Sequence, residues 1–178
     1  MRVISGKARG TSLFSLEGSH TRPTTDRVKE AMFSIINFYL YDALVLDLFA
    51  GSGALGIEAL SRGAKKCIFV ENSHAAADVV RKNLEKTGLL DSSELKICDF
   101  KDYLDFAKEG FDVILLDPPY NKKLCDESLE IIYQKNLLND EGIIVCETEF
   151  EEVVSTRFIK KKDYKYGKIK LSVYTKGD

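Results

Sequence analysis

Between residues 43 and 146 the sequence alternates short apolar runs with longer segments whose apolar residues recur at helical spacing. The apolar runs occupy residues 43–48, 67–70, 95–98, 111–116 and 142–146. Strands that are apolar almost throughout, with amphipathic helices between them, are typical of a parallel sheet that helices cover on both faces. We therefore predict an α/β fold for the body of the chain.

The N-terminal segment predicts a small addition to this sheet. Residues 2–5 and 11–14 are short runs on either side of a glycine-containing turn, which favours a β-hairpin. A polar loop follows over residues 15–23, and Thr24 or Thr25 can cap the next helix. The apolar face expected for that helix consists of Val28, Ala31, Met32, Ile35, Ile36 and Tyr39.

The C-terminal tail predicts a second hairpin that closes the sheet. Its strands are expected over residues 157–162 and 168–175, on either side of Gly167, and they would add an antiparallel edge. A chain of 178 residues and 20.0 kDa fits one domain. We therefore expect residues 1–178 to form a single unit, with residues 1–22 as an N-terminal hairpin and loop.

Composition argues against several classes of protein. Hydrophobic residues make up 44% of the chain and charged residues 30%, so a packed core is expected rather than disorder. The sequence has no run of eighteen apolar residues for a membrane span, and its first residues lack the apolar block of a secretory signal. The four cysteines form no Cys-x-x-Cys pair, which argues against a zinc site or a disulfide framework. We expect a cytoplasmic protein with no metal and no membrane partner.

The net charge of -2 conceals an uneven distribution along the chain. Residues 1–30 carry a balance of +3, residues 157–178 carry +6, and residues 31–156 carry -11. Two basic ends that meet on one face of the fold would favour an anionic partner. A nucleic acid is therefore a candidate partner, bound at a local basic surface.

Acidic residues follow four of the predicted strands. These are Asp47, Glu71, Asp99 and Asp117. In an open parallel sheet, ligands bind beyond the carboxyl ends of the strands, at the point where the strand order reverses. The sequence therefore predicts a ligand site at this edge of the sheet.

A glycine turn follows the first apolar strand and opens a helix. Gly51, Gly53 and Gly56 match the pattern G-x-G-x-x-G, and Glu71 lies twenty residues beyond Gly51. Glycine permits a positive φ and a close approach of the backbone to a ligand, and Glu71 can accept hydrogen bonds from ribose hydroxyls. This motif alone also fits a nicotinamide-dependent oxidoreductase. Asp47 favours instead a ligand that carries an ammonium group and a sulfonium, and Asp99 can accept from an adenine amine.

The sequence Asp117-Pro118-Pro119-Tyr120 follows the fourth strand directly. The two prolines end the strand and fix a rigid turn, because neither can donate a backbone hydrogen bond. The Asp117 carboxylate and the Pro118 carbonyl could accept hydrogen bonds from an exocyclic aromatic amine and stabilise its developing positive charge. Tyr120 offers a ring on which a base removed from its stack could lie.

Together these motifs resemble the class I S-adenosylmethionine-dependent amino-methyltransferases. The segments 2–6, 22–30 and 49–64 are similar to the RsmD family, whose members methylate the N2 amine of one guanine in bacterial 16S ribosomal RNA, and the similarity spans nearly the whole chain. The resemblance implies a Rossmann-like, three-layer sandwich. Its sheet would be mostly parallel and seven-stranded, with an antiparallel C-terminal strand.

The resemblance also implies roles for individual residues. Asp117, Pro118, Pro119 and Tyr120 would hold the target guanine, and the methyl group would pass directly, in line and without a metal, from S-adenosylmethionine to the amine, leaving S-adenosylhomocysteine. The residues expected to bind this cofactor are Arg22, Thr24, Asp47, Phe49, Ala50, Gly51, Ser52, Gly53, Glu71, Asn72, Asp99 and Phe100. Those expected to bind RNA phosphates are Arg2, Lys7, Arg9, Lys122 and Lys123.

The implied partner is 16S ribosomal RNA, the small ribosomal subunit or an assembly intermediate, with no obligate protein partner. Three alternatives stay open from the sequence. An adenine-N6 nucleic-acid methyltransferase shares the Asp-Pro-Pro-Tyr motif, and a nicotinamide-dependent oxidoreductase shares the glycine turn. A non-catalytic RNA-binding assembly factor could share the fold.

Overall fold

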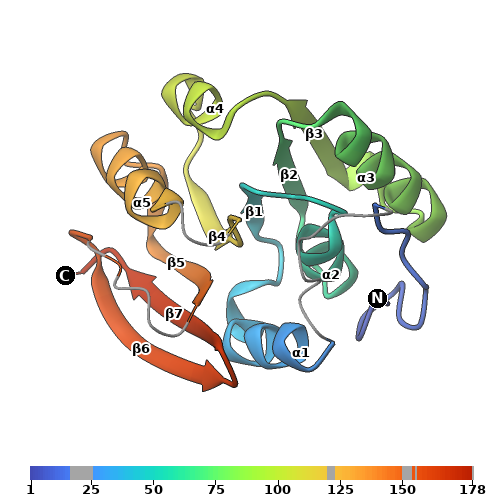
Figure 1. Cartoon of the computed structure of the whole chain (residues 1–178), viewed down its shortest axis with the longest axis horizontal. Helices are drawn as coiled ribbons and strands as arrows, with labels where there is room; N and C mark the ends of the chain where they lie inside the picture. The colour runs from blue at the N-terminus through green and yellow to red at the C-terminus, as the bar shows by residue number, and fades with distance from the viewer. Residues whose placement is uncertain (17–25, 120–122, 150–153, 155, 178) are drawn as a thin grey trace.

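The structure is a computed structural model, which describes residues 1–16, 26–119, 123–149, 154 and 156–177. Within these ranges seven strands form one sheet (Figure 1). The strands are β1 (Leu44–Asp47), β2 (Lys66–Glu71), β3 (Ser93–Ile97), β4 (Phe111–Leu116), β5 (Leu138–Glu149), β6 (Ile159–Tyr166) and β7 (Ile169–Thr175). The α-helices are α1 (Asp26–Ile35), α2 (Ala54–Ser61), α3 (His74–Thr87), α4 (Phe100–Phe106) and α5 (Leu124–Gln134). Two 3-10 turns, η1 (Asn37–Tyr39) and η2 (Leu90–Ser92), lie between them.

The strand order is β3-β2-β1-β4-β5-β7-β6. Strands β1 to β5 pair in parallel, and β7 runs antiparallel to both of its neighbours, β5 and β6. The order reverses between β1 and β4, which is where ligands bind in such sheets. The predicted mixed, mostly parallel sheet of seven strands is confirmed.

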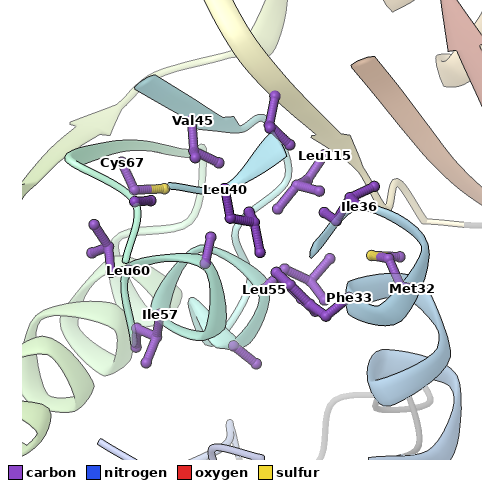
Figure 2. Packing of buried hydrophobic residues seen from close by; sticks show 14 of the residues in the cluster. Met32, Phe33, Ile36, Leu40, Val45, Leu55, Ile57, Leu60, Cys67 and Leu115 are labelled. Carbon is purple, nitrogen blue, oxygen red and sulfur yellow. The ribbon is translucent and has the colours of Figure 1, made fainter. Parts of the chain in front are cut away.

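Two buried clusters place helices on opposite faces of the sheet. On one face, side chains of α1 and α2 pack on alternate residues of the central strands, such as Val45 and Leu115 (Figure 2), and α3 adds side chains to the same cluster. On the other face, α4 and α5 pack on the residues between them, such as Leu46 and Leu116. Because successive strand residues point to opposite faces, strands that are apolar throughout supply both layers. The predicted three-layer arrangement is therefore confirmed.

The largest differences from the predicted strands are at the start of β5 and the end of β6. Strand β5 begins at Leu138 rather than at Gly142, because Leu138 pairs with Phe111 before an irregularity in the β4–β5 ladder. The exposed polar residues that follow Leu138 resemble a loop in sequence, and only the tertiary pairing makes them a strand. Strand β6 extends to Tyr166, so that the turn to β7 is confined to Gly167 and Lys168.

The N-terminal hairpin is reduced to one antiparallel bridge between Arg2 and Ser12, closed by a turn with positive φ at Gly6 and Gly10. The expected helix cap at Thr24 or Thr25 lies outside the described residues. Helix α1 begins at Asp26 and ends at Ile35. Its buried face includes Phe33, whereas Tyr39, which was predicted to belong to this face, is 40% exposed in η1. The helix ends one turn before Tyr39, so the predicted spacing does not extend to it.

Within the described residues, no helix is both long enough and apolar enough to cross a bilayer.

Candidate active site at the carboxyl edge of the sheet

The four predicted acidic residues lie at one edge of the sheet, where the parallel strands end; we call it the carboxyl edge. Asp47 and Glu71 are the last residues of β1 and β2. Asp117 follows the last residue of β4, and Asp47 is level with Leu115 in the β1–β4 ladder. Asp99 follows β3 by two residues and caps α4. The strand ends thus bring together groups that are up to 70 residues apart in the chain.

Asp47 is a buried carboxyl group with incomplete hydrogen bonding. Its residue is 1% exposed, and its Oδ2 accepts a hydrogen bond of 2.9 Å from the backbone N–H of Gly56. Its Oδ1 has no hydrogen-bond partner among the described residues. Burial, with a smaller effect of the nearby carboxylates Asp117 and Glu71, raises the pKa of Asp47 to about 7, and the hydrogen bond from Gly56 opposes this shift. A cation placed beside Oδ1 would complete its interactions and favour its ionised form.

The glycine turn adopts a backbone conformation that other residues rarely adopt. Gly51 and Gly53 have φ values of 56° and 78°, in the left-handed region. The turn is held by hydrogen bonds from the Gly53 N–H to the Ala50 carbonyl, 2.7 Å, and from the Gly51 N–H to Glu71 Oε2, 2.8 Å. A Cβ atom built on Gly51 would meet no atom of the described residues within 4 Å, so among these residues this side of the turn is open. The backbone can therefore be approached closely at Gly51.

Gly56, the third glycine of the motif, has a different role. A Cβ atom there would lie 2.3 Å from the ring of Phe69, so Gly56 lets α2 pack closely on β2. Its N–H is the donor to Asp47. Gly56 therefore positions the site and does not line it.

Glu71 supports the glycine turn and remains available to a ligand. Its Oε1 accepts a hydrogen bond of 2.9 Å from the Ser73 N–H, in addition to the bond from Gly51. Each carboxylate oxygen has a further lone pair, so the half-buried Glu71 can still accept from ribose hydroxyls. The neighbouring Asn72, also a predicted cofactor residue, is exposed on the same loop.

An aromatic pair connects two loops of the carboxyl edge. The Phe49 ring, just after β1, lies 5.2 Å from the ring of Phe100, which is buried at the start of α4. Asp99 is exposed, and its Oδ1 accepts a hydrogen bond of 2.9 Å from the Lys101 N–H. Phe49, Asp99 and Phe100 are therefore placed together, as their predicted common role requires.

The Asp-Pro-Pro corner begins directly beyond β4. Asp117 is half-buried, Pro118 is buried and Pro119 is exposed. Because Asp47 is level with Leu115 on the neighbouring strand, Asp117 lies only two residues beyond it, and the corner lies beside the end of β1. The remaining residues predicted near this site, Tyr120, Lys122, Arg22 and Thr24, lie outside the described residues.

The residues predicted to bind RNA lie in three places. Lys123 is exposed, has a φ of 51° and precedes α5 at the carboxyl edge. Arg2 forms a long ion pair of 3.5 Å with Asp26 at the start of α1. Lys7 and Arg9 are exposed in a turn whose backbone binds the last residue of α2, so they lie about 12 Å, one length of that helix, from the glycine turn.

Asn83 supports the glycine turn, and sequence analysis did not identify it as a site residue. It is buried in α3, and its Nδ2 donates to the carbonyl of Ser52 in the glycine turn, 2.8 Å, and to that of Phe14, 3.0 Å. Its Oδ1 accepts from the Phe14 N–H, 2.8 Å. Asn83 therefore joins the glycine turn to the N-terminal segment. A polar residue on an apolar helix face was the available signal.

Sequence analysis also missed a buried ionic group, which we call the Glu58 cluster. Glu58 accepts hydrogen bonds from the N–H groups of Ile4, 2.8 Å, and Ser5, 3.0 Å. Its carboxylate also pairs with the Arg62 guanidinium, 2.8 Å, and the Lys29 ammonium, 3.3 Å. Burial lowers the pKa of Lys29, and the adjacent Glu58 opposes this shift. The cluster fixes the N-terminal segment to α1 and α2.

In the part of the chain that the structure describes, no three His, Cys, Asp or Glu side chains are grouped to hold a metal ion. The polar groups at the carboxyl edge suit an organic cation that carries hydroxyl groups. Asp47 offers an unpaired carboxylate oxygen, Glu71 offers acceptors, and the glycine turn offers an open backbone.

Comparison with known proteins gives consistent matches. A family model described as Conserved hypothetical protein 95 matches residues 1–175. The Ribosomal RNA small subunit methyltransferase D of Haemophilus influenzae is 39% identical over 161 residues, which cover 88% of this chain and 82% of that protein.

Solved structures agree with the fold. The Escherichia coli protein yhhF superposes with a TM-score of 0.86 at 32% identity, over 99% of this chain and 97% of that one. An RNA methyltransferase of Salinibacter ruber in complex with S-adenosyl-L-homocysteine has a TM-score of 0.70 at 16% identity, covering 88% and 95% of the two chains, and this match bears on the fold alone. With a family model matched over nearly all of its length and a relative 39% identical over most of it, the chain belongs to the RsmD family.

Proposed function

We propose that this protein is an S-adenosylmethionine-dependent methyltransferase that acts on small-subunit ribosomal RNA. The observation that carries the proposal is the position of Asp47 and Asp117 at the ends of the neighbouring strands β1 and β4, with an open glycine turn between β1 and α2. The name of the Haemophilus influenzae relative supports the RNA substrate. In this proposal the chain functions as a single methyltransferase domain.

The described residues fit the cofactor. The unpaired Oδ1 of Asp47 would face its cationic methionine end, and Gly51 to Gly53 would lie along it. Glu71 would accept from the ribose hydroxyls. Asp99 would accept from the adenine amine beside the ring of Phe100. S-adenosylmethionine, when bound there, supplies an electrophilic methyl group on a sulfonium.

The protein's own residues act on the amine. An exocyclic amine of a nucleobase is a poor nucleophile, because its lone pair is delocalised into the ring. The Asp117 carboxylate and the Pro118 carbonyl would accept hydrogen bonds from its two N–H groups, orient its lone pair toward the methyl group and stabilise the positive charge that develops on nitrogen. The methylated nitrogen would then lose one proton to water. The rigid prolines hold both acceptors in place before the base arrives.

We further propose that the acceptor is the N2 amine of a guanine in 16S ribosomal RNA, and that the methyl group passes in line. Family membership supports this choice of base. Tyr120 would stack on the flipped base, and Arg22 and Thr24 would lie over the methionine end. Arg2, Lys7, Arg9, Lys122 and Lys123 would bind phosphates of the RNA.

Labelled methyl transfer tests the proposal. Incubation with labelled S-adenosylmethionine and small-subunit RNA or subunits from a strain that lacks the enzyme should label a guanine at N2, as nucleoside analysis will show. Label in N6-methyladenine would contradict the choice of base. A larger thermal shift with NAD than with S-adenosylhomocysteine would favour the oxidoreductase alternative.

Replacing Asp117 by Ala tests the role of the corner. We expect kcat to fall by about 10²-fold or more, because an acceptor for the developing charge is lost, while affinity for S-adenosylhomocysteine changes little. Asp140→Ala, which removes an exposed carboxylate at the opposite end of β5, is the matched control and should retain full activity. Retained activity in Asp117→Ala would refute the assignment and would favour a non-catalytic binding role.

A further inference from the structure

A cleft of about 460 Å³ lies between α1 and the turn that joins β6 to β7. Arg27 and Val28 line it from α1, and residues 165–169 line it from the turn. Figure 1 shows this turn close to α1, although the two segments are far apart in sequence. The cleft is separate from the glycine turn and from the Asp-Pro-Pro corner.

The walls of the cleft are basic. Arg27, Lys165 and Lys168 contribute three exposed cationic side chains, and none of the described residues that line the cleft is acidic. Asp26, the nearest acidic residue in the sequence, pairs with Arg2 at 3.5 Å. The cleft thus brings together one residue of the basic N-terminal segment and two of the basic C-terminal segment. Their combined positive potential attracts an anionic chain.

The floor of the cleft is apolar. Val28 and Ile169 are buried there, and Tyr166 packs partly against the same core. Cationic side chains around an aromatic and apolar floor are the arrangement that binds single-stranded nucleic acid, because phosphates meet the cations while sugars and bases contact the floor. An acidic peptide would use the cations but would leave the aromatic ring without a specific role.

The cleft opens on the carboxyl edge. Ile169 pairs with Glu149, the last residue of β5, and β5 also pairs with β4 so that Cys146 is level with Leu116, just before Asp117. Strand β7 is two strands from β4, or about 10 Å across the sheet. A strand of RNA whose target base lies at Asp117 can therefore reach the cleft within a few nucleotides.

We infer that this cleft binds the phosphate backbone of the RNA strand that flanks the target base, through Arg27, Lys165 and Lys168. The inference rests on the proposed function and adds a substrate-binding surface to it. The strand order places the β6–β7 turn on one side of β4, and on the other side it places β1 and β2, whose connecting helix α2 contacts the turn that holds Lys7 and Arg9. The RNA would then be held on both sides of the reacting base.

The salt dependence of RNA binding tests this inference. The double variant K165Q/K168Q removes two cations from the cleft, and K161Q/K162Q removes two from the same strand, about 10 Å farther along β6. Binding to a protein-free transcript of small-subunit ribosomal RNA is measured over a range of salt concentrations. We expect K165Q/K168Q to bind more weakly, with a slope of log K against log salt shallower by about 1.4, and K161Q/K162Q to match the unaltered protein. R27Q, on the other wall, should reduce the slope by about 0.7.

Parallel measurements separate the possible failures. Affinity for S-adenosylhomocysteine should be unchanged in all variants, and a change there would overturn the cleft as a separate site. If the unaltered protein methylates RNA while K165Q/K168Q keeps its full RNA affinity and slope, the cleft inference alone fails. If K165Q/K168Q loses affinity only for assembled subunits, the inference also fails, and a ribosomal protein is the occupant instead. If the unaltered protein neither binds nor methylates RNA, both the cleft inference and the proposed function fail.

Discussion

Two buried carboxyl groups, one on α2 and one that accepts from the first turn of α2, differ in how fully they are paired. Glu58, in the middle of the helix, is fully buried and accepts from two backbone N–H groups and two cationic side chains. Asp47, beside the start of the helix, is 1% exposed and accepts from one backbone N–H, with Oδ1 unpaired among the described residues. A buried, unpaired carboxylate oxygen destabilises the folded protein, so its presence requires an explanation.

The difference separates a structural group from a binding group. The Glu58 cluster has all its partners within the chain, so it serves to attach the N-terminal segment. Asp47 lies at the strand-order reversal, beside an open glycine turn and two further carboxylates. Its missing partner is expected to come from a ligand with positive charge.

The largest effect on stability is expected at Glu58. Glu58→Gln keeps the shape of the side chain but places an amide N–H₂ group against the N–H groups that the carboxylate accepts from. It also leaves the buried Lys29 ammonium without its counterion. We expect the free energy of unfolding to fall by about 3–5 kcal/mol, as when one partner of a buried ion pair is removed. Denaturant unfolding measures this loss, and hydrogen exchange at Ile4 and Ser5 should become faster.

Glu30→Gln is the matched control for this change. Glu30 lies on α1 and is exposed, so its substitution should alter the free energy of unfolding by less than about 0.5 kcal/mol. Equal effects of the two substitutions would remove the distinction between Glu58 and an ordinary surface carboxylate.

The contribution of Asp47 to the free energy of unfolding should depend on pH. Its pKa is about 7 in the folded protein and 3.8 for an aspartate side chain free in water, so between these pH values the folded state holds a proton that the unfolded state has released. Rising pH therefore lowers the free energy of unfolding across this window, by about 4 kcal/mol at most. Asp47→Asn removes this contribution, so its stability relative to the unaltered protein should increase from pH 4 to pH 8.

Ligand binding reports on the same carboxyl group. If a cationic ligand needs ionised Asp47, affinity for S-adenosylhomocysteine should rise about tenfold from pH 6 to pH 8, and Asp47→Asn should bind weakly at both values. Calorimetry at the two pH values measures this change. Affinity in Asp47→Asn that equals that of the unaltered protein at pH 8 would show that Asp47 has only a structural role.

The sequence predicted the regions that local pattern determines. The five parallel strands follow from apolar runs, and the acidic residues at the carboxyl edge follow from their positions after those runs. The positive φ at Gly51 and Gly53 agrees with the glycine turn. Each of these features depends on residues within a few positions of one another, combined with one rule of sheet topology.

Features that depend on distant pairing were not predicted. Glu58 and Lys29 are ordinary charged residues of amphipathic helices in sequence, and only packing of α1 on α2 buries them together. Arg27 and Lys168 are 141 positions apart and meet only because β7 is inserted between β5 and β6. The early start of β5 at Leu138 has the same origin, since its pairing with Phe111 overrides a loop-like sequence.

Asn83 joins the N-terminal segment to the glycine turn, so its substitution should reduce both stability and ligand affinity, each to a smaller extent than the changes above. Asn83→Ala leaves the N–H and carbonyl of Phe14 and the carbonyl of Ser52 without their side-chain partner. We expect a loss of about 1–3 kcal/mol in the free energy of unfolding, together with weaker binding of S-adenosylhomocysteine. Thr87→Val, which removes only hydrogen bonds to carbonyls of its own helix, is the control and should leave ligand affinity unchanged. Unchanged ligand affinity in Asn83→Ala would mean that the glycine turn is independent of the N-terminal segment.

The smallest effect on stability is expected at Gly51, where the substitution separates strain from ligand contact. Gly51→Ala places a Cβ in open space at a φ of 56°, and Gly88→Ala does the same at 68°, at the end of α3. Each should lower the free energy of unfolding by about 1–2 kcal/mol, because both force alanine into the left-handed region. Only Gly51→Ala should also abolish binding of S-adenosylhomocysteine, since only there would the added methyl group stand where the ligand approaches the backbone. Equal ligand affinity in the two variants would show that the open side of the glycine turn faces solvent. A cation that pairs with Asp47 would then not belong to a ligand bound along this turn.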